Sequence, residues 1–196
     1  MNIEGIWFYN MNSFIVLEII DPEVNALFSA IWKITMGTTN PKRAHITLRG
    51  PYKGRVPISA INTCKKRLQY DAIRLNGIGK FINGDENVVY IQVSSPNIRE
   101  TWWKPDYPIS EFGFEPHISL YRGENKKLAD CIYKYLTKEK IDIICAEHRI
   151  IVNKVHEYDL FKTEYRIEGK YDILIENKKI SRTFINRLKK IVEDNK

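Results

Sequence analysis

The chain has 196 residues, the size of one domain or of one domain with two lobes, and it can bury a core without disulfide or metal staples. Its composition, 43% apolar and 12% aromatic, excludes a disordered protein. The net charge of +7 favours an anionic partner such as RNA or a nucleotide, although a solvated lysine-rich surface would carry the same charge.

The three cysteines form no CxxC pair, and Cys64 and Cys131 fall on apolar faces of predicted helices, which is typical of thiols in a reducing compartment. No apolar run approaches the roughly 20 residues of a membrane span. An acidic Glu4 without early Lys or Arg argues against a secretory signal. We therefore expect a soluble cytoplasmic protein that acts as a monomer away from membranes.

The first part of the chain predicts a strand, a helix and a strand. Residues 13–20 form an apolar run that is typical of a buried strand. Asp21 and Pro22 predict a helix, as its N-cap and its first residue. The inner face of this helix has i, i+3, i+4 and i+7 spacing: Val24, Leu27, Phe28 and Ile31. A strand over about 44–49 is expected to stop at Gly50-Pro51.

The rest of the chain continues the mixed pattern. A helix beginning at Pro57 is followed by a hairpin of two strands, because Asn83-Gly84-Asp85-Glu86 is a turn signal. A long loop over 94–115 leads to the remaining expected elements: a strand at about 117–122, a third helix, strands near 141–146, 149–160 and 165–175, and a basic amphipathic helix over about 180–193. This order predicts an α+β fold.

His45-Ile46-Thr47-Leu48 and His117-Ile118-Ser119-Leu120 repeat one pattern of histidine, apolar, hydroxyl, apolar. On a strand, each histidine shares a face with the hydroxyl two residues later, while the apolar pair faces the core. Two such strands could bring two imidazoles and two hydroxyls into one cleft. Core histidines bonded to neighbouring hydroxyls are the alternative, but a chance doubling is on the order of one in a few hundred for this composition.

The stretches His45–Tyr52 and Pro116–Gly123, with the order of elements around them, resemble the 2H phosphoesterase superfamily, whose members carry two His-x-Thr/Ser-x motifs. That group includes 2′–5′ RNA ligase-like proteins, cyclic nucleotide phosphodiesterases and viral enzymes that cleave 2′–5′ oligoadenylate or cyclic oligonucleotide signals. The resemblance implies two pseudo-symmetric antiparallel-sheet lobes over 1–160, with helices outside and a central cleft. Residues 161–196 would be an extension, a strand plus the basic helix, packed on the same domain.

The expected catalytic residues are His45, Thr47, His117 and Ser119. One imidazole would take a proton from the attacking oxygen and the other would protonate the leaving oxygen, and a histidine pKa of about 6.5 suits both tasks. The two hydroxyls would donate to the non-bridging phosphate oxygens. The sequence does not distinguish the base from the acid. The resemblance implies no metal and no cofactor.

Extending the strand alternation by one step gives Arg49 and Tyr121 as candidate substrate-binding residues at the cleft. Arg49 could pair with a phosphate, and Tyr121 could hydrogen-bond it or stack on a base. Each could instead face solvent in a strand-end turn. Arg122 and Tyr52 are weaker candidates for the same role.

Aromatic residues on loops are candidate platforms for a nucleobase. Trp102 and Trp103 lie in the loop before the second motif, and Tyr9 precedes the first strand. The two tryptophans could equally be satellite-core residues under a long loop. His148 and His156 lack a hydroxyl partner two residues later, and no metal site is predicted from them.

These observations favour a metal-independent phosphodiesterase that acts on RNA ends with a 2′,3′-cyclic phosphate or on 2′–5′ linkages. One alternative with the same chemistry is a nuclease that degrades cyclic oligonucleotide immune signals, as phage anti-CBASS proteins do. The alternative from another class is a non-catalytic RNA-binding module that keeps the fold.

Overall fold

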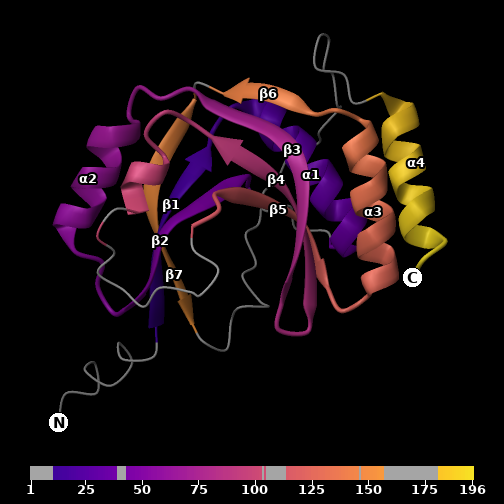
Figure 1. The fold of residues 1–196 in the computed structure, drawn as a ribbon, viewed down its shortest axis with the longest axis horizontal. Helices are drawn as coiled ribbons and strands as arrows, with labels where there is room; N and C mark the ends of the chain where they lie inside the picture. Colours follow the sequence, from indigo (N-terminus) through magenta and orange to yellow (C-terminus); the bar gives the residue numbers. More distant parts are fainter. Residues whose placement is uncertain (1–10, 39–42, 103, 105–113, 146, 157–180) are drawn as a thin grey trace.

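The protein is described by a computed structural model that covers residues 11–38, 43–102, 104, 114–145, 147–156 and 181–196. These residues form a mixed α+β fold with two antiparallel sheets (Figure 1). The strands are β1 (Met11–Ile19), β2 (His45–Lys53), β3 (Ile73–Asn83), β4 (Glu86–Ser94), β5 (His117–Gly123), β6 (Asp142–Cys145) and β7 (His148–His156). The helices are α1 (Pro22–Met36), α2 (Ile58–Leu68), the 3-10 helix η3 (Arg99–Trp102), α3 (Lys126–Lys138) and α4 (Arg182–Glu193).

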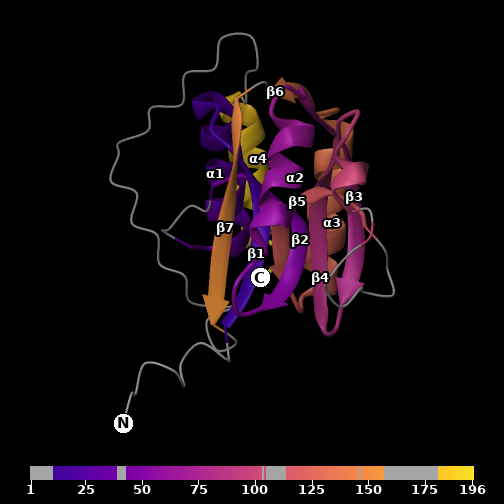
Figure 2. The ribbon, with the colours of Figure 1, turned by 90° about the vertical axis from the view of Figure 1, so that its left-hand side faces the viewer.

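The two sheets have the strand orders β2-β1-β7 and β5-β4-β3-β6. Each motif strand is therefore the edge strand of its own sheet. Figure 2 shows β2 and β5 next to one another where the two sheets meet, with the other strands extending away on both sides. The expected hairpin is confirmed, because β3 and β4 pair up to Asn83 and Glu86 across the two-residue turn.

The start of α1 follows from its capping residues. The Asp21 carboxylate accepts hydrogen bonds from the backbone N–H groups of Glu23 and Val24, both at 3.0 Å, and Pro22 is the first helical residue. The face expected to point inward is buried, and the helix ends at Gly37 in the left-handed conformation at φ 63°. The sequence prediction for this helix is confirmed.

The prediction that the first motif strand stops at Gly50-Pro51 is wrong, because β2 continues to Lys53. Proline lacks a backbone N–H, yet an edge strand has one unpaired side that tolerates it. Gly50 has a φ of 125°, and a Cβ there would lie 2.8 Å from the Phe14 ring. The absence of a side chain lets β2 pass close to β1 and keep pairing as far as Lys53 with Asn12.

One cluster of buried apolar side chains runs through both sheets and the helices packed on them. Ile46, Leu48, Ile118 and Leu120 are at most 4% exposed, as the motif pattern predicts. From the C-terminal part, α4 packs against α1 and α3 and buries Phe184, Leu188 and Val192. The strand expected near 165–175 lies outside the described residues. Among the described helices, none is long and apolar enough to cross a membrane.

Candidate active site

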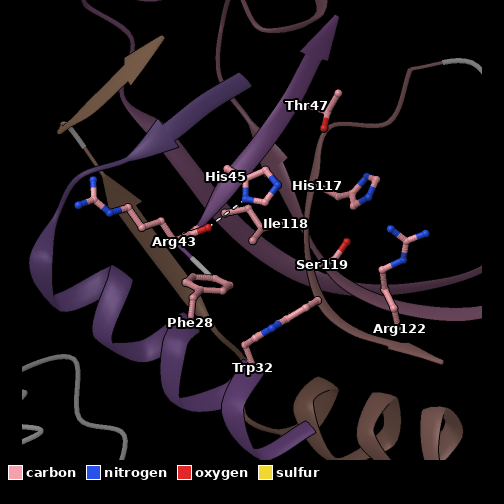
Figure 3. Close-up of a pocket in the computed structure, with 10 residues that line it drawn as sticks. Phe28, Trp32, Arg43, His45, Thr47, His117, Ile118, Ser119 and Arg122 are labelled. Carbon is pink, nitrogen blue, oxygen red and sulfur yellow. Dashed lines mark hydrogen bonds between the residues drawn. The ribbon is translucent and has the colours of Figure 1, made fainter. Parts of the chain in front are cut away.

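The two motif strands bring their polar residues to one pocket (Figure 3). His45 and Thr47 come from β2, His117 and Ser119 come from β5, and all four line the pocket. Phe28 and Trp32 of α1 complete one wall, and the remaining lining residues are Arg43, Ala44, Ile118 and Arg122. Of the described residues that line it, none is a carboxylate. The pocket therefore combines two imidazoles, two hydroxyls and positive charge.

Both imidazoles are held in the same way. Nδ1 of His45 lies 3.0 Å from the backbone carbonyl oxygen of Arg43, and Nδ1 of His117 lies 2.7 Å from that of Glu115. A carbonyl oxygen can only accept, so each Nδ1 carries a hydrogen and donates it. The proton-transfer atom of both rings is therefore Nε2, which accepts a proton in the neutral imidazole and gives it up from the imidazolium.

Each motif strand has a β-bulge at the same place, the apolar residue that ends its motif. In β2, Thr47 pairs with Val16 and Arg49 pairs with Ile15, so Leu48 is an extra residue. In β5, Ser119 pairs with Tyr90 and Tyr121 pairs with Val89, so Leu120 is extra. A bulge reverses the alternation of faces beyond it.

The C-terminal turn of α1 stabilises the β5 bulge. The Thr35 hydroxyl donates to the carbonyl oxygen of Leu120 at 2.6 Å, and the backbone N–H of Arg122 donates to the sulfur of Met36 at 3.3 Å. Thr35 is 3% exposed, so the Leu120 carbonyl that it contacts is buried, and leaving that carbonyl without a donor would lower the free energy of unfolding. These two contacts provide hydrogen-bond partners for backbone groups of the bulge that the sheet leaves unpaired.

Because of this bulge, Arg122 rather than Tyr121 lines the pocket. The Arg122 guanidinium donates to the Glu86 carboxylate at 2.6 Å, which holds the side chain in place. Its Nε is buried and has no hydrogen-bond partner among the described residues. Figure 3 shows the guanidinium on the same side of the pocket as His117 and Ser119. A fixed cation that lines the pocket at this place can bind a phosphate oxygen.

His117 has a different environment from His45. Its ring packs against Tyr90, with ring centroids 5.0 Å apart, and against Phe81 at 5.3 Å. This burial lowers the pKa of His117, and the positive charges of Arg122 and His45 lower the same pKa further. The Glu115 carbonyl and carboxylate act in the opposite direction but do not outweigh these effects. His117 is therefore biased toward the neutral form.

Arg49 does not line the pocket, and the placement expected from strict alternation is wrong for this residue. It is 5% exposed, and its guanidinium donates to the Tyr52 hydroxyl at 2.9 Å and to the backbone carbonyl of Thr101 at 2.8 Å. The β2 bulge turns it inward, where it ties the strand to η3 and to the Lys104 carbonyl.

The expected position of Tyr121 of β5 at the cleft is also wrong. It is 4% exposed in the core, and its hydroxyl donates to the Asn125 carbonyl at 3.4 Å. The residue two positions along, Gly123, leaves room for the ring, because a Cβ there would lie 2.7 Å from the Tyr121 hydroxyl. Tyr121 is therefore a packing residue between β5 and the start of α3.

Of the aromatic residues expected to stack on a base, the structure describes Trp102. It stacks on Phe114, with ring centroids 5.2 Å apart and an interplanar angle of 16°, and both pack on the core. It does not line the pocket, which agrees with a satellite-core role. Trp103 and Tyr9 lie outside the described residues.

The sequence did not predict three of the residues that line the pocket, Trp32, Arg43 and Ala44, and Trp32 is the largest of them. Trp32 belongs to α1. It follows Phe28 by four residues, so both lie on one side of α1, and Figure 3 shows both directed at the pocket from below. The available signal was this spacing of four residues from Phe28, which was already expected on the inner face of the helix.

Among the described residues, no group of three or more His, Cys, Asp or Glu side chains is arranged to hold a metal ion. His148 donates from Nε2 to the Leu68 carbonyl at 2.8 Å, so it links β7 to the end of α2. The side chain of His156 is not described.

The comparisons with known proteins add no family to this geometry. No family model, no curated protein and no solved structure matches the chain.

Proposed function

We propose that this protein is a metal-independent phosphodiesterase that cleaves a 2′,3′-cyclic phosphate or a 2′–5′ linkage in RNA or an oligonucleotide. The observation that carries the proposal is the convergence of His45, Thr47, His117 and Ser119 on one pocket from two strands far apart in the sequence. Identical Nδ1 contacts and matching bulges support a two-lobed arrangement of the 2H phosphoesterase type, with β2 and β5 as equivalent strands.

In this proposal His117 is the base and His45 is the acid. A base must be neutral before the reaction, and burial together with the Arg122 charge favours neutral His117. Nε2 of His117 takes the proton from the attacking oxygen as the new O–P bond forms. His45 gives a proton to the oxygen that leaves as the old P–O bond breaks, so charge does not build up on either oxygen.

The remaining polar groups act on the phosphate itself. Thr47 and Ser119 donate to the non-bridging oxygens, and Arg122 neutralises the charge that these oxygens gain in the transition state. Arg122 is already fixed by Glu86, so little side-chain freedom is lost when the phosphate binds.

The test is a cleavage assay in EDTA on a panel: a dinucleotide with a 2′,3′-cyclic phosphate end, 2′–5′ oligoadenylate, and several cyclic di- and trinucleotides. At least one member is expected to be cleaved. Activity that EDTA abolishes would contradict the metal-independent mechanism. No cleavage together with tight RNA binding would identify a binding module instead, and cleavage of the cyclic oligonucleotides alone would identify a nuclease for cyclic signals.

A further inference from the structure

A second surface continues from the pocket across the sheet that contains His117. In this sheet Gln92 pairs with His117, Tyr90 pairs with Ser119, and Gly79 pairs with Tyr90. Side chains at paired positions lie on the same face of a sheet. The face that carries the two motif residues of β5 therefore extends over β4 and on to β3.

Two glycines of β3 shape this face. A Cβ on Gly79 would lie 2.2 Å from the Tyr90 ring, and a Cβ on Gly77 would lie 2.6 Å from the side-chain oxygen of Gln92. Since neither glycine has a side chain, the Tyr90 ring and the Gln92 amide lie across β3 instead of standing out from the sheet.

The exposed parts of this surface are a ring and an amide. Phe81 is 37% exposed although its ring contacts both His117 and Tyr90 at 5.3 Å. Tyr90 is 9% exposed, and its ring packs against both Phe81 and His117, at centroid distances of 5.3 Å and 5.0 Å. Gln92 is exposed, and its amide lies against Gly77 of β3. A side-chain amide offers both donors and an acceptor.

We propose that Phe81 and Gln92 form a nucleobase subsite beside His117, with Phe81 as the stacking surface and Gln92 as the hydrogen-bonding group at the base edge. The inference rests on the proposed function, because it takes the scissile phosphate to lie between the two histidines. A base attached to the adjoining ribose is one sugar away from that phosphate, and the Phe81 ring packs edge-on against the His117 ring, with centroids 5.3 Å apart. The substrate class is thus a nucleotide held by its base as well as its phosphate.

The test compares binding of two ligands by titration calorimetry: adenosine 2′-monophosphate and the base-free methyl riboside 2-phosphate. Wild-type protein is expected to prefer the nucleotide by roughly 5- to 150-fold, the range for stacking one base. Phe81→Ala and Phe81→Leu should remove most of this preference, and Phe81→Trp should retain it. Ile82→Ala is the matched control, because Ile82 is the next residue of β3 and is 60% exposed.

Gln92 has its own readout in the same assay. Gln92→Ala is expected to reduce the difference in affinity between the adenine and uracil nucleotides and to leave the base-free ligand unaffected. Unchanged discrimination would remove Gln92 from the subsite.

The outcomes separate the subsite from the proposed function. Equal weakening of both ligands by Phe81→Ala, or a wild-type protein without preference, would overturn the subsite even if the panel is cleaved. A base preference that depends on Phe81, in a protein that cleaves no panel member, would uphold the subsite while the phosphodiesterase proposal fails.

Discussion

The strands β2 and β5 carry the same motif, the same bulge and the same Nδ1 contact, yet their histidines differ in surroundings. His117 packs against two aromatic rings and has a cation five residues later, Arg122, in the pocket. The matching position in β2 is Gly50, which has no side chain and passes close to β1.

This difference shows how one motif can supply two chemical roles. The backbone geometry is shared, so both rings present the same nitrogen for proton transfer. The pKa of His117 is lowered by burial, where its ring packs against Phe81 and Tyr90, and by the positive charge of Arg122 in the same strand. Such surroundings favour the neutral form that a catalytic base requires.

The largest expected effect comes from removing either imidazole. His45→Ala and His117→Ala should each lower the rate of cleavage by about 10²-fold or more, the usual scale for an acid–base group. Initial rates on the cleaved panel member would be measured, with thermal unfolding as the check on folding. His148→Ala is the matched control, since His148 lies outside the pocket and bonds to Leu68. A histidine variant with full activity would show that its strand takes no part in catalysis.

Arg122→Gln tests whether the different surroundings of His117 and His45 give them different roles. Loss of the charge that faces the phosphate should lower the rate by roughly 10²-fold, as for the loss of a transition-state donor. The rate should fall at low pH because His117 must be neutral, and it should fall at high pH because His45 must be protonated. Since Arg122 lowers the His117 pKa, its removal should raise that pKa and move the acidic limb to higher pH.

The pH profile of kcat/KM for wild type and Arg122→Gln distinguishes the two assignments. A shift of the basic limb, with the acidic limb fixed, would mean that His117 is the acid. Glu86→Gln serves as the companion variant, because it frees Arg122 from its ion pair and keeps the cation.

Arg49→Met should affect stability more than rate. Its loss leaves the buried Thr101 carbonyl and the Tyr52 hydroxyl without their donor, which costs about 1–3 kcal/mol in the free energy of unfolding. Denaturant unfolding would measure this change. Arg122→Gln is the contrasting variant, since its side chain is partly exposed. If Arg49→Met lost much of its cleavage rate while its stability stayed unchanged, Arg49 would be a substrate-binding residue.

Tyr121→Phe should have the smallest effect. It removes one long hydrogen bond to Asn125 and keeps the buried ring, so the unfolding free energy should fall by about 0.5–1.5 kcal/mol at most. The cleavage rate and KM should stay unchanged. A raised KM would indicate that the hydroxyl reaches the substrate and that the bulge opens in solution.

Local pattern was sufficient for most elements. The Asp21 cap, the apolar spacing of α1 and the turn at Gly84 act between residues close in sequence, so the sequence alone specifies them. The alternation within each motif correctly put the isoleucine and the leucine in the core, although Ile118 also lines the pocket. The repeated motif predicted that two strands would bring their histidines into one cleft, and both histidines line one pocket. That the two strands are the edges of separate sheets is a feature of the tertiary structure.

Only the tertiary structure decided which face of its strand each residue occupies beyond the fourth residue of the motif. A bulge depends on the partner strand and on the elements that satisfy its freed groups, here Thr35 and Met36 from α1. It exchanged Tyr121 for Arg122 in the pocket, and the rings from β3 and β4 then made His117 unlike His45. Sequence determined which groups are present and on which strands. Long-range packing determined their faces and the burial that lowers the His117 pKa, because both depend on neighbours distant in the chain.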